Sequence, residues 1–226
     1  MRGVFVTGTD TGVGKTLACC ALVHALREAG EAVFPMKPIA AGAVERDGRS
    51  VNEDTMALLE AAGLGVEALD RVTPILLREP MSPHIAAARE GRRIWLEPVI
   101  ESLRAASGFR VVEGVGGFMV PLGETLDTVD LARAIGLPVV LVVGLRLGCL
   151  NHSLLTARAI GAAGLDLAGW IANAIDPRML VVEENVETLR ARIAAPLLGR
   201  LPWHPRPDPR ALARSLDVRP LLGASA

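Results

Sequence analysis

Residues 4–16 read Val4-Phe5-Val6-Thr7-Gly8-Thr9-Asp10-Thr11-Gly12-Val13-Gly14-Lys15-Thr16. An apolar run enters a Gly-rich loop that ends in Gly-Lys-Thr, and a helical pattern follows from Leu17 to Ala29. A strand, a Gly-rich loop and a helix in this order are typical of a polyphosphate-binding loop, because backbone N–H groups and the helix N-terminus attract anions. In such a loop the Lys contacts the outer phosphates and the Thr hydroxyl holds Mg²⁺.

The spacing of this loop departs from the usual pattern, in which a Gly precedes Gly-Lys-[Ser/Thr] by four intervening residues. Thr9 stands at that position, and the glycine is Gly8 instead. The loop is therefore a non-standard variant of the phosphate-binding motif. Its role has to be inferred together with the rest of the chain.

The composition favours one domain, residues 1–226, with a substantial core. Half of the 226 residues are hydrophobic, which argues against disorder. The net charge is −1, so we expect no nucleic-acid partner and no anionic membrane partner, since both select a clustered basic excess.

The cysteines and the N-terminus favour a cytoplasmic protein. Cys19, Cys20 and Cys149 have neither disulfide nor metal spacing, and reduced thiols are usual in the cytosol. The chain starts on a strand pattern without a secretory signal, and no apolar run is long enough to span a bilayer. We expect the last residues, Arg219 to Ala226, to be loosely held.

Apolar strand patterns alternate with helical patterns along the whole chain. The strands are predicted at Gly3–Thr7, Ala32–Lys37, Val72–Leu76, Arg110–Glu113, Pro138–Val143, Leu167–Ala174 and Pro196–Leu201. The helices are predicted at Thr16–Ala29, Asp54–Ala62, Leu96–Ala106, Thr128–Ala134, Ser153–Ala163, Met179–Arg192 and Pro209–Leu216. This alternation predicts an α/β fold, a parallel-sheet P-loop NTPase domain with helices on both faces. Residues 38–53 and 77–93 are predicted to be irregular loops.

Polar residues at strand ends are candidates for the site, because ligands of parallel sheets bind at the carboxyl edge. Lys37 closes a strand, and beside a phosphate loop a second cation could stabilise phosphoryl transfer. Glu113 ends another strand before a Gly-rich turn, where an acid is well placed to hold Mg²⁺. On its own, Asp54 is best explained as an acid that complements its helix dipole. Asn173 is interpreted either as a turn residue or as a residue that contacts a nucleobase.

Further segments accompany the loop: Lys37-Pro38-Ile39-Ala40, Ser82-Pro83-His84, Val112-Glu113-Gly114-Val115-Gly116-Gly117, Val142-Val143-Gly144-Leu145-Arg146-Leu147-Gly148-Cys149-Leu150-Asn151-His152, Ala168-Gly169-Trp170-Ile171-Ala172-Asn173 and Leu201-Pro202-Trp203. In these segments, in their order and in the displaced Gly8, the chain resembles the dethiobiotin synthetase family over nearly its whole length. The set is specific, whereas a phosphate loop alone is shared by many families.

The resemblance implies an ATP-dependent ligase of biotin synthesis. Members of the family convert 7,8-diaminopelargonic acid and CO₂ (or bicarbonate) to dethiobiotin. One amine becomes a carbamate, which attacks the γ-phosphate of MgATP to give a carbamic–phosphoric anhydride. The second amine then closes the ureido ring, and ADP and phosphate are released. Family members are homodimers with the substrate at the subunit interface.

The resemblance also implies roles for individual residues. Lys37, Lys15 and Thr11 would be catalytic, and Thr16, Asp54 and Glu113 would hold Mg²⁺. ATP would contact Gly12, Val13, Gly14, Lys15, Thr16, Leu17, Asp54, Glu113, Gly114, Val115, Gly116, Asn173, Ala174, Pro202, Trp203 and His204. Substrate would contact Thr11, Lys37, Ala41, Gly116 and Gly117 in one subunit and Gly148, Cys149, Leu150 and Asn151 across the dimer, where a helix begins.

Some positions depart from the family pattern. Ala41 stands where a Ser or Thr is common, Arg146 replaces a frequent Lys, Val115 replaces an Ala, and Asn185 lies near a position where some members use Tyr. These changes concern substrate affinity rather than the type of reaction.

Two other functions fit a phosphate loop in a parallel sheet. A regulatory ATPase of the partitioning or division-site type would carry an extra Lys early in the loop, where this chain has Asp10. A nucleotide sensor without turnover would not need Lys15, Lys37, Thr16 and Glu113 together. The sequence therefore favours the ligase.

Overall fold

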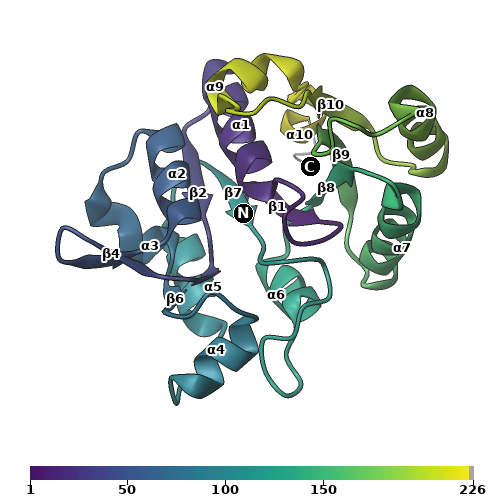
Figure 1. Cartoon of the computed structure of the whole chain (residues 1–226). Helices are drawn as coiled ribbons and strands as arrows, with labels where there is room; N and C mark the ends of the chain where they lie inside the picture. Colours follow the sequence, from purple (N-terminus) through teal and green to yellow (C-terminus); the bar gives the residue numbers. More distant parts are fainter. Residues whose placement is uncertain (224–226) are drawn as a thin grey trace.

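A computed structural model describes residues 1–223, and its centre is a six-stranded parallel sheet with the strand order β10-β9-β8-β1-β7-β2 (Figure 1). In chain order these strands are β1 (Gly3–Gly8), β2 (Val33–Met36), β7 (Phe109–Glu113), β8 (Val139–Leu145), β9 (Leu167–Ala174) and β10 (Leu197–Leu201). The parallel sheet confirms the predicted fold class.

The strands are apolar because helices cover both faces of the sheet. Every residue of β8 is buried. Along β1, Val4 and Val6 pack into a different cluster from Phe5, since successive side chains point to opposite faces. One face carries α1 (Lys15–Glu28), α9 (Pro209–Leu212) and α10 (Arg219–Leu222), and the other carries α5 (Glu97–Ala105), α6 (Thr128–Ile135), α7 (Cys149–Ala162) and α8 (Val182–Arg192). Figure 1 shows α7 and α8 side by side at one end of the molecule.

The register aligns the carboxyl ends of the central strands. Val6 lies opposite Glu113 in β7, and Gly8 lies opposite Val142 in β8. The loop after β1 therefore lies beside the residues that follow β7, at the edge where parallel sheets bind ligands.

One predicted strand is misplaced. Pro74 interrupts the apolar run Val72–Leu76, because proline has no N–H for a strand ladder. The chain instead forms α3 (Leu69–Val72) and then β6 (Ile75–Leu77), which pairs with β3 (Ile39–Ala41) in a separate two-stranded sheet.

The predicted irregular stretches contain regular elements. Between residues 38 and 53, β4 (Val44–Arg46) and β5 (Arg49–Val51) form a hairpin. Its turn residues, Asp47 and Gly48, both have positive φ, and Asp-Gly is a strong hairpin signal that we missed. The second stretch contains α4 (Pro83–Arg89), which begins at a proline as helices often do.

Several helix boundaries differ from the prediction. α7 begins at Cys149 rather than Ser153, α8 begins at Val182, and α9 gives way to a 3₁₀ turn. The remaining helices are α2 (Glu53–Ala62) and the 3₁₀ turns at Val66–Ala68 and Ala213–Ser215. The tail predicted to be loose forms α10 in part, and residues 224–226 lie outside the described residues. Among residues 1–223 no helix has the length and apolar character that a membrane span needs.

Candidate functional site

A cavity of about 690 Å³ lies beside the loop that follows β1. The predicted site residues in its lining are Thr11, Gly12, Gly14, Lys15, Thr16, Lys37, Ala41, Asp54, Glu113, Val115 and Gly116. Pro80, Met81, Ser82, Pro83 and Val120 complete the wall. The sequence signalled only Ser82 and Pro83 among these five, as part of a quoted segment without an assigned role.

The phosphate loop depends on glycines in left-handed backbone conformation. Gly12 has φ 74° and Gly14 has φ 84°, and α1 begins immediately afterwards at Lys15. A side chain on Gly14 would overlap the amide of Asn173. That amide, 3% exposed, donates from Nδ2 to the carbonyl of Val13 at 2.9 Å. Asn173 therefore fixes the loop, and the predicted contact of Asn173 with adenine stays a prediction.

Lys37 lies between two carboxylates at the floor of the cavity. Its Nζ is 2.5 Å from Glu113 Oε1 and 2.8 Å from Asp54 Oδ2. The Thr16 hydroxyl is 2.8 Å from Asp54 Oδ1 and 2.8 Å from Glu113 Oε1. The four side chains come from the ends of β2 and β7 and the starts of α1 and α2. The three predicted metal ligands and one predicted catalytic lysine thus form a single cluster.

Charge is retained in this cluster although it is largely buried. Burial opposes the charge on Lys37, but Glu113 and Asp54 outweigh it and hold the pKa of Lys37 above its ordinary value. Burial likewise opposes the charge on Asp54, but Lys37 and the Thr16 hydroxyl keep the pKa of Asp54 below its ordinary value. Lys37 and Asp54 are therefore both charged at neutral pH. For Lys15, burial lowers the pKa and the nearby charge of Lys37 lowers it further.

The three predicted metal ligands, Thr16, Asp54 and Glu113, are chemically suited to Mg²⁺. Mg²⁺ prefers oxygen ligands and is usually held by one or two carboxylates together with phosphate oxygens and waters. Glu113 Oε2 is buried and has no hydrogen-bond partner within residues 1–223, so one oxygen of this carboxylate is unpaired in the protein. Two carboxylates and a hydroxyl are the hard donors that this ion requires.

Asn52 positions two site residues and was not assigned from the sequence. Its Oδ1 accepts hydrogen bonds from the backbone N–H groups of Asp54 and Thr55 at the start of α2. Its Nδ2 donates to the carbonyl of Ala41 at 3.2 Å. An Asn before Glu53-Asp54 is a helix N-cap signature that could have been recognised. The Asp54 side chain itself is directed to Lys37 and Thr16, so it does more than complement the helix dipole.

Asp10 links the inserted part of the phosphate loop to the turn after β8. Its Oδ2 accepts from Arg146 at 2.7 Å, its Oδ1 accepts from the N–H of Thr11 at 2.7 Å, and its carbonyl accepts from Lys15 Nζ at 3.0 Å. The carbonyl of Arg146 in turn accepts from the N–H of Cys149 at the start of α7. Arg146, a departure from the family pattern, thus has a defined partner.

The residues predicted to bracket adenine lie at neighbouring strand ends. Asn173 of β9 pairs in register with Leu201 of β10. Pro202, Trp203 and His204 follow β10 and are exposed, with Trp203 46% exposed. They do not line the cavity beside the phosphate loop, but they share the carboxyl edge of the sheet with that loop.

The residues predicted to contact substrate across a dimer, Gly148 to Asn151, lie outside this cavity. Gly148 has φ 94° and precedes α7, whose first turn has no side-chain cap. The Cys149 side chain is 1% exposed, so it offers no thiol to a ligand. None of the residues 148–151 lines the cavity. Five further predicted residues lie outside the lining: Val13, Leu17, Gly114, Gly117 and Ala174. All of them except Ala174 adjoin a lining residue in sequence.

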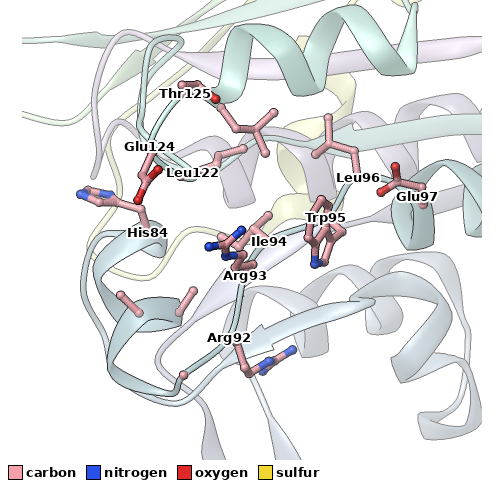
Figure 2. Close-up of a pocket in the computed structure, with 15 residues that line it drawn as sticks. His84, Arg92, Arg93, Ile94, Trp95, Leu96, Glu97, Leu122, Glu124 and Thr125 are labelled. Carbon is pink, nitrogen blue, oxygen red and sulfur yellow. The ribbon is translucent and has the colours of Figure 1, made fainter.

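The start of α4 separates this cavity from a second one of about 740 Å³. Ser82 and Pro83 line the first cavity, whereas His84 lines the second. Figure 2 shows His84, Trp95 and Glu124 around the second cavity, and no predicted site residue lines it. His84 Nδ1 lies 3.1 Å from the carbonyl of Pro121 and 3.2 Å from Ser82 Oγ. His84 therefore links the start of α4 to the backbone at Pro121.

The parallel sheet and the phosphate loop followed by α1 define a P-loop nucleoside triphosphatase fold. Solved structures support this class at low sequence identity. The septum site-determining protein MinD complexed with Mg-ADP from Pyrococcus horikoshii matches with a TM-score of 0.55 and 20% identity, over 90% of this chain and 82% of that chain. Chloroplast FtsY from Physcomitrella patens matches with a TM-score of 0.53 and 17% identity, over 98% and 65%. At such identities these matches show the fold alone.

Sequence relatives identify the family. A family model described as an AAA domain matches residues 2–211. Proteins named ATP-dependent dethiobiotin synthetase BioD match from Aromatoleum aromaticum, with 55% identity over 96% of this chain and 97% of the relative, and from Ralstonia nicotianae, with 53% identity over 96% of each. A relative of the same name from Xanthomonas oryzae is 49% identical over 95% of this chain and 96% of its own length. The chain belongs to the dethiobiotin synthetase family.

Proposed function

We propose that this chain converts 7,8-diaminopelargonic acid, CO₂ and ATP to dethiobiotin, ADP and phosphate, as a ligase that forms a cyclic ureido bond. The observation that carries the proposal is the 55% identity, over 96% of the chain, to a protein named ATP-dependent dethiobiotin synthetase. The gathering of Lys15, Lys37, Thr16, Asp54 and Glu113 at one cavity supports it. A cytoplasmic location stays a prediction.

The proposed mechanism asks the protein to position reactants and to stabilise anions. One substrate amine adds to CO₂ and loses a proton, which gives a carbamate. A carbamate oxygen attacks the γ-phosphorus and ADP leaves. The second amine then attacks the carbamate carbon, phosphate leaves, and a proton is lost as the ring closes.

The site residues have distinct proposed tasks. The loop from Gly12 to Thr16 binds the phosphates through backbone N–H groups, and Lys15 binds the outer phosphates. Lys37 stabilises the anion that forms between carbamate and γ-phosphate. Thr11, beside Gly116, contacts the carbamate. Thr16, Asp54 and Glu113 would hold Mg²⁺, which when bound neutralises charge on the phosphate oxygens.

Product analysis tests this proposal. Protein incubated with MgATP, diaminopelargonic acid and ¹³C-bicarbonate is expected to give dethiobiotin that carries one ¹³C, and omission of any component should abolish the product in mass spectra. With ¹⁸O-bicarbonate, the released phosphate should carry one ¹⁸O, because a carbamate oxygen becomes a phosphate oxygen.

Two results would contradict the proposal at different levels. Unlabelled phosphate together with labelled dethiobiotin would exclude the anhydride but keep the overall reaction. ATP hydrolysis that proceeds equally without diaminopelargonic acid, with no dethiobiotin formed, would favour the regulatory ATPase instead.

We further propose a homodimer in which α7 of one subunit faces the cavity of the other. Leu147, directly before the predicted carboxylate-binding turn, is 95% exposed, and Met119, next to the cavity residue Val120, is 67% exposed. In the proposed dimer, both of these exposed apolar side chains would be covered by the partner subunit. Gly148 to Asn151 would then reach the substrate carboxylate with backbone N–H groups.

The variant Leu147→Asp is expected to shift the dimer to monomer in light scattering and to lower ligase activity with it, because a charge would be buried in the interface. The matched control is Val66→Asp, since Val66 is 47% exposed and lies in the 3₁₀ turn after α2, at the β2 edge of the sheet and away from α7. A wild-type protein that is monomeric at assay concentration would overturn the homodimer.

A further inference from the structure

The ammonium of Lys37 occupies the carboxylate pair that would hold a divalent cation. Lys37 Nζ contacts Glu113 Oε1 at 2.5 Å and Asp54 Oδ2 at 2.8 Å, and the lysine is 4% exposed. A lysine dedicated to phosphate binding would point into the cavity. This lysine is instead engaged by both predicted acidic metal ligands.

The carboxylate oxygens of Asp54 and Glu113 leave too little room for Lys37 and a divalent cation to bind them at the same time. Glu113 Oε1 already accepts from Lys37 and from Thr16 Oγ1. Mg²⁺ requires oxygen ligands at about 2.0–2.1 Å in near-octahedral arrangement. An ammonium and a divalent cation bound to the same oxygens would also repel each other strongly in a buried site. The two cations therefore exclude one another.

We propose that Lys37 and the divalent cation are alternative occupants of the Asp54–Glu113 pair, so that metal binding displaces Lys37 into the cavity. The inference rests on the metal ligands of the proposed function. Lys37 lines the cavity, so its ammonium has open space on the side where phosphate and carbamate would lie.

The displacement gives Lys37 two successive tasks. Before the metal binds, Lys37 compensates the buried carboxylate of Glu113 and the partly exposed carboxylate of Asp54, which would otherwise repel each other. After the metal binds, the carboxylates are neutralised by the metal and the lysine is released toward the reacting groups. The lysine is thus available for charge stabilisation only in the metal-loaded site.

The sequence makes this displacement directly observable. The chain has only two lysines, Lys15 and Lys37, and its other 22 basic residues are arginines. Protein labelled with ¹³Cε-lysine should therefore give two lysine signals in NMR, which Lys15→Met assigns. Mg²⁺ added without nucleotide is expected to shift the Lys37 signal and leave the Lys15 signal nearly in place, because Lys15 Nζ bonds to the Asp10 carbonyl rather than to a carboxylate.

Direct metal binding provides a second measurement. Mn²⁺ affinity, measured by electron paramagnetic resonance without nucleotide, should increase by at least about tenfold in Lys37→Met, since a competing positive charge is removed. The matched control is Lys15→Met, which removes an equal charge from the same cavity and should change Mn²⁺ affinity by less than about threefold. Thermal melts of both variants check that the fold is intact.

Three outcomes would overturn the displacement. They are a Lys37 signal that does not move at saturating Mg²⁺, an unchanged Mn²⁺ affinity in Lys37→Met, and an equal gain in Lys15→Met, which would reflect net charge alone. If Lys37→Met fails to fold, the wild-type NMR experiment still decides the question. None of these readouts uses diaminopelargonic acid, so a failure of the proposed reaction is distinguished from a failure of this inference.

Discussion

Lys37→Ala is expected to lower kcat for dethiobiotin formation by about 10²–10³-fold, the usual effect of removing one group that stabilises developing charge. KM for ATP should change by less than about threefold, because the triphosphate is held mainly by the loop after β1 and by Lys15. The expected loss follows from the position of Lys37: its ammonium lies next to Glu113 and, once released into the cavity that it lines, faces the side where the γ-phosphate and carbamate would meet. Steady-state kinetics at saturating Mg²⁺ measure both parameters.

The conservative variant Lys37→Arg separates charge from geometry. Arginine keeps the charge, but its planar guanidinium does not reproduce a compact ammonium between two carboxylates, so we expect activity between the wild type and Lys37→Ala. An unchanged turnover in Lys37→Ala would remove this lysine from the chemistry. A large rise in KM for ATP with kcat intact would make Lys37 a ground-state binding residue instead.

Gly14→Ala is expected to weaken nucleotide binding by roughly 10- to 300-fold. A non-glycine residue in left-handed conformation costs about 1–2 kcal/mol, and Gly14 has φ 84°. The added methyl would also overlap the Asn173 amide and disturb its bond to the Val13 carbonyl, a bond worth about 0.5–1.5 kcal/mol. The loop relaxes in the free protein and must be rebuilt when ATP binds, so the cost appears as lost affinity in titration calorimetry.

The matched control for this prediction is Gly30→Ala. Gly30 has φ 91°, and a methyl group there would have no atom within 4 Å. It follows α1 on the side away from the phosphate loop. Gly30→Ala should lower the melting temperature through backbone strain while ATP affinity stays at the wild-type value. Equal affinity losses in both variants would show that global stability, and not the loop geometry, controls nucleotide binding.

The sequence predicted the sheet and the phosphate loop because both follow from local rules. Continuous apolar runs such as Val139–Leu145 are buried on both faces wherever they occur in a parallel sheet. Gly-Lys-Thr between a strand and a helix fixes where phosphate binds. The apolar run Val72–Leu76 does not form one strand because Pro74 interrupts it. The Asp47-Gly48 hairpin, which was not predicted, has a local Asp-Gly signal.

Residues far apart in the sequence were harder to assign. From local sequence alone Asp54 is best explained as a helix-dipole residue, since nothing local connects it with Lys37 and Glu113. Its role depends on the Asn52 cap, which begins α2 beside Ala41 and directs Asp54 toward Thr16. The Asp10–Arg146 pair likewise joins residues 136 positions apart, and no periodicity or spacing predicts such a contact.

The fold class, the phosphate loop and the family could be predicted from the amino-acid sequence, because these depend on short motifs and on the alternation of apolar segments. Only the tertiary structure decided that Lys37, Asp54, Glu113 and Thr16 form one hydrogen-bonded cluster. The physical reason is that the parallel register brings the carboxyl ends of β1, β7 and β2 to one edge. At that edge the buried ammonium of Lys37 needs carboxylates to balance its charge. The carboxylates that it contacts, Asp54 and Glu113, are the ones that a metal ion would require.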